Sequence, residues 1–315
     1  MSTEGAKTKK YTENRPELRR RLRKARPVYI MILPVIIYFL IFYYWPLYWL
    51  RMAFYDFSLY RGFSGSTFVG LENFRRFVTD MDFWKLIRNV LVLNTYSLIF
   101  CFPAPILFAL LLNELRMKHF RKAVQAVSYL PHFISMVAFV GLISAILSPS
   151  TGILAHIVTA FGGNAVYYLG HAKYFRAICV ISGIWQETGW ASIVYLSAMT
   201  AIDPDLYEAA MMDGADRFQR LLHITVPCIC TTIIIMLILK IGTMMSIDFE
   251  KVYLLQNSAN LDVSEMIQTW VYKRGLIRYD YSLATAAGLF NSLISLVLVA
   301  VSNRVSRRFT DTSLW

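Results

Sequence analysis

Residues 208–227 read EAAMMDGADRFQRLLHITVP, a charged segment that is interrupted by a glycine and lies between two long apolar stretches. Three residues separate its Glu-Ala-Ala triplet from Gly214, and nine more separate Gly214 from Ile224. Val226 and Pro227 close the segment. A charged loop between two apolar stretches offers a cytosolic protein a place to bind if those stretches cross a membrane. The fold therefore depends on the character of the flanking sequence.

The composition is that of a membrane protein. Of the 315 residues 57% are hydrophobic and only 17% are charged, and the mean hydropathy is +0.47. Soluble domains are less apolar and carry about one quarter charged residues. A helix needs about 20 apolar residues to cross a bilayer. We expect an all-α integral membrane protein with six transmembrane helices, over residues 28–50, 89–113, 125–147, 176–200, 225–247 and 281–303.

These spans divide the chain into a basic tail (1–27), a transmembrane domain (28–303) with a loop at 201–224, and a second tail (304–315). Most of the 32 Lys and Arg residues fall in the two tails, in the loop after the second span and in loop 201–224. Because basic loops stay in the cytoplasm, we expect both termini and loop 201–224 to be cytoplasmic. The first span is too long for a signal peptide and is expected to remain as an anchor.

Several function classes find no support in the sequence. A net charge of +12 is compatible with nucleic-acid binding. However, the basic run at 19–26 directly precedes an apolar span, which is typical of a segment that binds lipid headgroups and orients the span in the membrane. The four cysteines lie in or beside spans and lack metal-ligand spacing. We find no phosphate-binding loop and no HExxH or GxSxG motif. The chain is therefore expected to be neither catalytic nor metal-binding, and its energy must come from a partner.

The loop itself shows helix signals. Asp203 is suited to the N-cap and Pro204 to the first position of a short helix. Gly214 can adopt the left-handed backbone that ends such a helix. A second short helix is expected from about Asp216 to Leu222. On these signals alone, a plain cytoplasmic helical hairpin remains an alternative.

The spacing of the loop resembles the signature of the membrane subunits of bacterial ATP-driven (ABC) importers, EAA, three residues, G, nine residues, I, one residue, LP. Only Val226 in place of Leu departs from it. Four further segments look like the polysaccharide-type permeases of binding-protein-dependent importers, a class similar to the maltose-type permeases: Gly70-Leu71-Glu72-Asn73-Phe74, Phe102-Pro103-Ala104-Pro105-Ile106, Tyr129-Leu130-Pro131-His132-Phe133 and Ser313-Leu314-Trp315.

The resemblance implies a permease subunit in a bacterial inner membrane that forms half of the pathway for oligosaccharides, among them acidic ones such as alginate or pectin fragments. It also implies four kinds of partner: a homologous second permease, two ATPase subunits that bind ATP and Mg²⁺, an extracytoplasmic solute-binding protein, and membrane lipid. Loop 201–224 would then couple the ATPase to the spans through Glu208, Ala209, Ala210, Asp213, Gly214, Ala215 and Phe218.

A substrate pathway can be argued from the charged residues inside the spans. Glu187 and Trp190 share a face of the fourth span with Gly183. Carboxylates and amides bind sugar hydroxyls, and aromatic rings stack on sugar C–H faces. An ionised residue at mid-membrane is costly and usually faces a cavity or a partner. The candidate pathway residues are therefore Gln186, Glu187, Trp190 and Lys240.

Two alternatives remain for these residues. Glu187 and Lys240 can instead form an ion pair that only holds the fourth and fifth spans together. A stand-alone secondary transporter, in which the two residues couple ions to solute movement, is the alternative function, although we find no internal repeat of the kind such proteins often show. An intramembrane enzyme using Glu187 or His132 lacks any nucleophile and base at suitable spacing.

Overall fold

The computed structural model describes residues 25–245 and 249–309, most of which are helical. Most of the predicted basic tail, the last residues of the predicted C-terminal tail and the Ser313-Leu314-Trp315 segment lie outside this range. The chain divides into two compact units, residues 1–52 and 53–315.

The described part of the first unit is helical. It consists of α2 (Arg26–Phe39), the π-helical η1 (Leu40–Tyr44), α3 (Trp45–Leu47) and the start of η2 (Tyr48–Phe54). The whole helix, Arg26–Phe54, is long and apolar enough to cross a membrane. None of the residues in α2, η1 or α3 is buried. A helix that is apolar on every side is stable where lipid or another membrane helix surrounds it.

A π-turn directly precedes a proline in three of the long helices. η1 ends two residues before Pro46, η3 (Ser97–Cys101) two residues before Pro103, and η6 (Leu221–Thr225) two residues before Pro227. Proline has no backbone N–H, and its ring collides with the carbonyl one turn earlier. The wider π-turn relieves that collision without ending the helix. The prolines therefore deform these helices but do not terminate them.

The second unit begins with a small hairpin. Strands β1 (Tyr55–Asp56) and β2 (Thr67–Phe68) pair antiparallel, and α4 (Glu72–Val78) follows. The buried Asn73 side chain on α4 donates 3.0 Å hydrogen bonds to the carbonyl oxygens of Ala53 and Tyr55. Gly70 turns the chain into α4 with a φ of +58°, a value that favours glycine. The left-handed turn at Gly70 and the hydrogen bonds of Asn73 give these two residues of the Gly-Leu-Glu-Asn-Phe segment a structural role.

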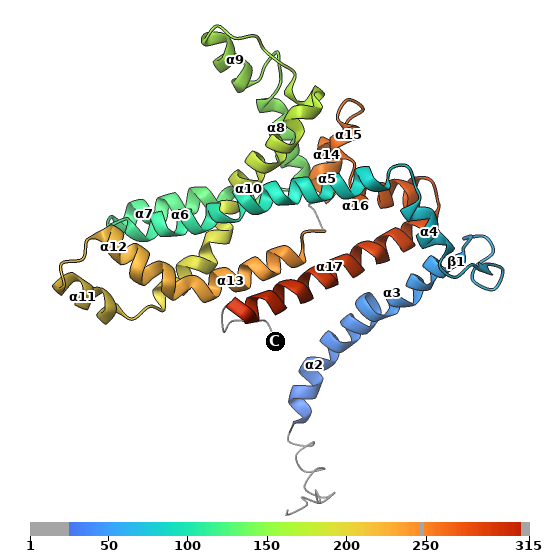
Figure 1. Cartoon of the computed structure of the whole chain (residues 1–315), viewed down its shortest axis with the longest axis horizontal. Coiled ribbons are helices and arrows are strands. Elements are labelled where there is room, and N and C mark those ends of the chain that lie inside the picture. Colours follow the sequence, from blue (N-terminus) through green and yellow to red (C-terminus); the bar gives the residue numbers. More distant parts are fainter. Residues whose placement is uncertain (1–24, 246–248, 310–315) are drawn as a thin grey trace, which may run out of the picture. The chain divides into compact units, whose positions relative to one another are not determined.

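The rest of this unit is helical and is coloured by sequence in Figure 1. Its long helices are α5 (Phe83–Tyr96) continued by η3 and α6 (Pro103–Glu114), then α10 (Ala172–Thr200), then α12 (Arg217–Arg220) continued by η6 and α13 (Val226–Gly242), and finally α17 (Tyr281–Phe309). The shorter elements are α7 (Lys118–Tyr129), η4 (Leu130–Phe133), α8 (Met136–Ile146), α9 (Ile153–Ala160), η5 (Tyr168–Gly170), α11 (Pro204–Met212), α14 (Phe249–Leu255), α15 (Leu261–Ser264), α16 (Ile267–Tyr272) and η7 (Lys273–Ile277).

The third predicted span, residues 125–147, is not one straight helix. The chain breaks at η4, and the helices on either side are bent by 104°. Pro131 removes a backbone donor within η4, and Ser135 then starts α8 as a new helix by accepting a hydrogen bond from the backbone N–H of Ala138. The span predicted over 125–147 is therefore broken at this proline rather than one continuous helix, and its crossing of the membrane stays a prediction.

Among the described residues, four helices are long and apolar enough to cross a membrane by length and composition, or five if the bent pair around η4 counts as one span. They begin at Arg26, Phe83, Arg217 and Tyr281. The fourth predicted span, 176–200, lies within α10, a single helix of 29 residues that is not among them. α10 carries polar residues because it packs against α6, α7 and α13 rather than standing alone.

Two hydrophobic clusters hold the second unit together. The larger joins α4, α5, α8, α16 and α17 around Phe77, Phe139 and Trp270. The smaller joins α6, α10 and α13 around Leu112, Tyr195 and Ile229. Figure 1 shows α13 and α17 running alongside one another, in agreement with their packing contacts. The smaller cluster positions the helices that form the sites described next.

Candidate functional site

The first candidate site is the segment containing α11 and the start of α12. The Asp203 side chain accepts a 3.0 Å hydrogen bond from the backbone N–H of Asp205, and Pro204 occupies the first turn of α11. The predicted start of the helix is confirmed. Figure 1 places α11 and α12 toward the left end of the long axis, where the turn from α6 to α7 also lies.

The end of α11 depends on Gly214. Its φ of +80° is left-handed, and no atom within 4 Å would meet a β-carbon there. The N–H of Ala215 donates to the carbonyl oxygen of Ala210 at 2.9 Å, and that of Gly214 donates to Met211 at 3.1 Å. This pattern closes a helix at a left-handed residue. The predicted role of Gly214 as the helix terminator is confirmed.

The second helix of the loop does not stand alone. Asp216 caps α12 through a capping box, in which its carboxylate accepts from the Gln219 N–H at 2.7 Å and the Gln219 side chain accepts from the Asp216 N–H at 2.8 Å. The helix then runs without interruption from Arg217 to Gly242. No break in the helix marks the boundary expected at about 224/225 between loop and span, so the position of that boundary stays a prediction. The helix that begins in the loop is therefore a direct extension of the fifth predicted span.

A hydrogen bond links the loop to that helix. The Tyr207 hydroxyl on α11 lies 2.9 Å from the hydroxyl of Thr225, which is buried in the π-turn ahead of Pro227. The sequence analysis missed this contact. The residues lie 18 positions apart on different helices, so spacing along one helix could not have indicated it.

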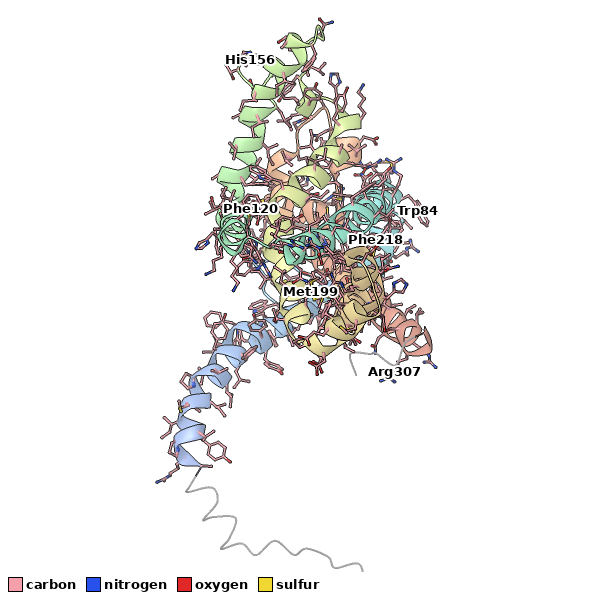
Figure 2. The ribbon with its side chains drawn as sticks, turned by 90° about the vertical axis from the view of Figure 1, so that its left-hand side faces the viewer. Trp84, Phe120, His156, Met199, Phe218 and Arg307 are labelled. Atoms are coloured by element: carbon pink, nitrogen blue, oxygen red, sulfur yellow. The ribbon has the colours of Figure 1, made fainter. Side chains whose placement is uncertain are left out.

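The predicted coupling residues form an accessible surface. Glu208, Ala209, Asp213, Gly214 and Phe218 are exposed, whereas Ala210 and Ala215 are half-buried. Phe218 is 67% exposed, and Figure 2, which views the molecule from this end, labels its side chain. The neighbouring Met212 is 89% exposed. Large exposed apolar side chains beside a charged helix are typical of a protein-binding surface.

The second candidate site is a cavity of about 390 Å³ inside the second unit. α10 forms one wall, the junction of η3 and α6 forms another, and α13 and α14 close it. Its charged lining residues are Glu187, Lys240 and Lys251, and Asn94, Thr243 and Tyr195 add polar groups. A cavity with both charges and hydroxyls among apolar walls can bind a polar solute.

Glu187 contacts a histidine that the sequence analysis did not include among the pathway residues. Its carboxylate oxygens lie 3.3 and 3.2 Å from Nδ1 of His132 in η4. The His132 ring stacks on Trp190, with centroids 4.7 Å apart and planes only 4° from parallel. The Glu187 side chain remains 49% exposed. Thus the break at Pro131 brings a polar group to the carboxylate at the cavity wall.

The four predicted pathway residues separate into two pairs. Glu187 and Lys240 line the cavity. Gln186 is 3% exposed, is not a lining residue, and its Oε1 has no hydrogen-bond partner among the described residues. Trp190 also lies outside the lining and stacks on His132. Among the described residues, Glu187 pairs with His132 and not with Lys240. The alternative of an ion pair between Glu187 and Lys240 is therefore not what the structure shows.

Lys251 is a charged cavity residue that the sequence analysis missed. It follows the fifth predicted span and reads as an ordinary loop charge, but α14 carries it to the cavity, where it is 4% exposed. No signal in one sequence indicates that α14 packs against α8 and brings the Lys251 side chain to Gly183 of α10. Within the described parts of the chain, no group of three His, Cys, Asp or Glu residues could hold a metal ion.

Comparisons with known proteins agree with this architecture. Residues 88–311 match the family described as binding-protein-dependent transport system inner membrane component. The polygalacturonan/rhamnogalacturonan transport system permease protein YteP of Bacillus subtilis is 42% identical over 96% of this chain and 94% of its own length. The protein LplB of Bacillus subtilis is 40% identical over 93% of this chain and 92% of its own.

Solved structures are also similar. The crystal structure of a bacterial ABC transporter involved in the import of the acidic polysaccharide alginate contains a chain with a TM-score of 0.85 and 41% identity, covering 93% of this chain and 99% of the other. A bacterial alginate ABC transporter in complex with an alginate pentasaccharide-bound periplasmic protein gives a TM-score of 0.85 and 42% identity, with 94% and 99% covered.

These matches favour an ATP-driven importer over a stand-alone ion-coupled transporter. The chain belongs to the family of binding-protein-dependent transport system inner membrane components and is therefore a membrane permease subunit rather than an enzyme.

Proposed function

We propose that this permease forms one half of the translocation pathway of an ABC importer for oligosaccharides, with fragments of acidic polysaccharides as its substrates. The observation that carries the proposal is the cavity between α10 and α13, which contains charged groups inside a unit built of membrane-length helices. The relatives named for polygalacturonan and for alginate support the acidic class.

Within the cavity, Glu187 and Lys240 are proposed to contact the passing sugar. The carboxylate accepts hydrogen bonds from hydroxyls, and the ammonium donates to hydroxyls and carboxylates. Trp190 acts through His132, which it orients by stacking. Gln186 is proposed to contribute from just outside the cavity lining. Its side chain is buried, and its amide oxygen has no hydrogen-bond partner among the described residues.

The coupling surface formed by Glu208, Ala209, Ala210, Asp213, Gly214, Ala215 and Phe218 is proposed to bind an ABC ATPase. Because α12 continues into α13 without a break, movement of this surface displaces a helix that lines the cavity. ATP and Mg²⁺ would be bound by two such ATPase subunits and not by this chain. A homologous second permease supplies the other half of the pathway.

The proposed topology is six membrane crossings with both termini and the α11–α12 loop in the cytoplasm. The bent α7–α8 segment supplies the third crossing and α10 the fourth. An extracytoplasmic binding protein would deliver the sugar from the opposite side, as the similar solved complex with a periplasmic protein suggests.

The test is reconstitution of the complete transporter in proteoliposomes with its binding protein. Uptake of trigalacturonate and stimulation of ATP hydrolysis by the loaded binding protein are measured together. ATP-dependent uptake supports the function. Uptake that needs only an ion gradient, or the absence of any copurifying ATPase, contradicts it.

A further inference from the structure

The inference concerns His132, whose imidazole is held between two side chains of α10. Its Nδ1 atom lies 3.3 and 3.2 Å from the two carboxylate oxygens of Glu187. Its ring stacks on the indole of Trp190, with the ring centroids 4.7 Å apart. Because an ionised carboxylate only accepts hydrogen bonds, we assign a proton to Nδ1. Trp190 thus fixes the plane of the imidazole, and Glu187 fixes the direction of its N–H group.

The backbone explains why one imidazole meets both groups. Glu187 and Trp190 are three residues apart on α10, so their side chains are neighbours on the helix surface. The chain breaks at Pro131, and η4, which carries His132, packs against α10 at this break. The break in the third predicted span therefore presents the imidazole to the carboxylate.

Glu187 connects the histidine to the cavity. Glu187 lines the cavity, whereas His132 is not a lining residue. Histidine is the side chain that ordinarily changes its charge between about pH 5 and pH 8. With a neutral imidazole the His132–Glu187 pair carries one negative charge, and with a protonated imidazole it carries none. A sugar that passes Glu187 is therefore exposed to a local charge that depends on the proton of His132.

Other charged groups surround the pair. Lys240 of α13 and Lys251 of α14 line the same cavity as Glu187. The helix α7 also packs against η4, but its basic residues lie at its start, at the end remote from η4: Lys118, His119, Arg121 and Lys122. Among the described side chains, the ion-pair partner of His132 is Glu187. Because all the other groups are the same in every variant of His132, substitution of this residue isolates the effect of its proton.

We propose that His132 is the positioning residue of Glu187 and sets the charge preference of the pathway. Its Nδ1–H group orients the carboxylate, and protonation of its ring cancels the negative charge that repels a uronate. The pathway therefore accepts acidic sugars better at low pH than at high pH. The inference rests on the proposed function and adds the regulation of that site. Glu187 remains the group that contacts the sugar, and His132 acts through it.

The experiment compares uptake of trigalacturonate with uptake of its fully methyl-esterified form, in proteoliposomes containing the complete transporter and its binding protein. Uptake is measured at about pH 5.5 and about pH 7.5, because an ordinary imidazole titrates between these values. Ordinary carboxyl groups are ionised at both, so only the first sugar is charged. The ratio of acid to ester uptake removes every effect of pH that the two sugars share, including effects on ATP hydrolysis.

The measured quantity is the acid to ester ratio at the lower pH divided by that at the higher pH. Its value in the wild type should exceed its value in His132→Asn by about threefold to tenfold, the effect of one unit charge several ångströms from the uronate in a hydrated cavity. Asparagine keeps an N–H donor in place of Nδ1 but does not titrate. Since both transporters use the same binding protein, its own response to pH cancels. Equal values in the two would overturn the proposal.

Two further variants complete the series. His132→Gln, which has a longer amide side chain, should lose the pH dependence in the same way and replaces His132→Asn if that variant fails to assemble. His156→Asn is the matched control, because His156 is an exposed histidine of α9 that is not a cavity-lining residue. It should keep the pH dependence of the wild type. A purely structural role of His132 would lower uptake of both sugars equally in the amide variants and leave the pH dependence intact, which would overturn the proposal.

Glu187→Gln decides the matter if neither amide variant of His132 assembles. It removes the negative charge of the pair at the higher pH. The acid to ester ratio at that pH should then rise to about the value that the wild type shows at the lower pH, whatever the loss in absolute uptake. An unchanged ratio would show that the charge of this pair does not select the sugar.

The remaining outcomes separate the two proposals. If the wild type imports trigalacturonate by ATP hydrolysis and its pH dependence equals that of the His132 variants, only the role of His132 is overturned. If the wild type imports the ester or another neutral sugar but not the acid, the acidic substrate class fails and the role of His132 fails with it.

Discussion

The coupling loop and the cavity differ in how their residues come together. The loop draws its shape from one run of sequence, in which Asp203, Gly214 and Asp216 each act on backbone groups within three residues or on their own φ. The cavity takes its charged groups from α10, α13 and α14, and its histidine neighbour from η4. Local signals therefore describe the first site and leave the second incomplete.

The largest effect is expected from a substitution in the coupling loop. Gly214→Val places a β-branched residue at a φ of +80°, where the strain costs of order 1–3 kcal/mol. The end of α11 should shift, and sugar uptake should fall by more than about tenfold. ATPase copurification and uptake are measured together.

Gly214→Asn is the matched control, because asparagine tolerates left-handed backbone better than other residues with side chains. It should retain most of the uptake. Equal losses in the two variants would show that side-chain bulk, rather than backbone conformation, determines the effect.

The next largest effect is expected in the cavity, whose charged groups come from several helices. Glu187→Gln keeps the shape of the side chain but replaces a charge-assisted contact with His132 by a neutral one, a loss of about 1 kcal/mol. Uptake should fall about fivefold while the amount of assembled complex stays constant. Glu72→Gln, on the exposed side of α4, serves as the control. Normal uptake by Glu187→Gln would remove this carboxylate from the pathway.

The smallest effect tests the link between the loop and its helix. Tyr207→Phe removes the hydroxyl that contacts Thr225, a hydrogen bond of about 0.5–1.5 kcal/mol. We expect about threefold less sugar taken up per ATP hydrolysed, with the ATPase still bound. Tyr60→Phe, at a fully exposed tyrosine, should change nothing. An unchanged ratio in Tyr207→Phe would mean that α12 transmits the movement without this hydrogen bond.

The break in the third predicted span shows where apolar length alone misleads. Residues 125–147 contain enough apolar side chains for a span, but Pro131 and Ser135 redirect the chain by 104°. By contrast, Pro46, Pro103 and Pro227 leave their helices continuous, because a π-turn precedes each of them. A proline in the sequence thus indicates a deformation, and the packing around it decides whether the helix continues.

The sequence by itself determined the helical membrane class, the start of α11 at Asp203 and its end at Gly214, because hydropathy, capping and left-handed backbone are properties of adjacent residues. It also indicated that Glu187 does not face lipid, since an ionised side chain within a membrane span usually faces a cavity or a partner group. Only the tertiary structure decided that His132 contacts Glu187, that Gln186 is buried behind the cavity wall, and that Lys251 reaches Gly183. These arrangements involve helices that are far apart in the chain, so the packing of those helices, and not the local sequence, determines them.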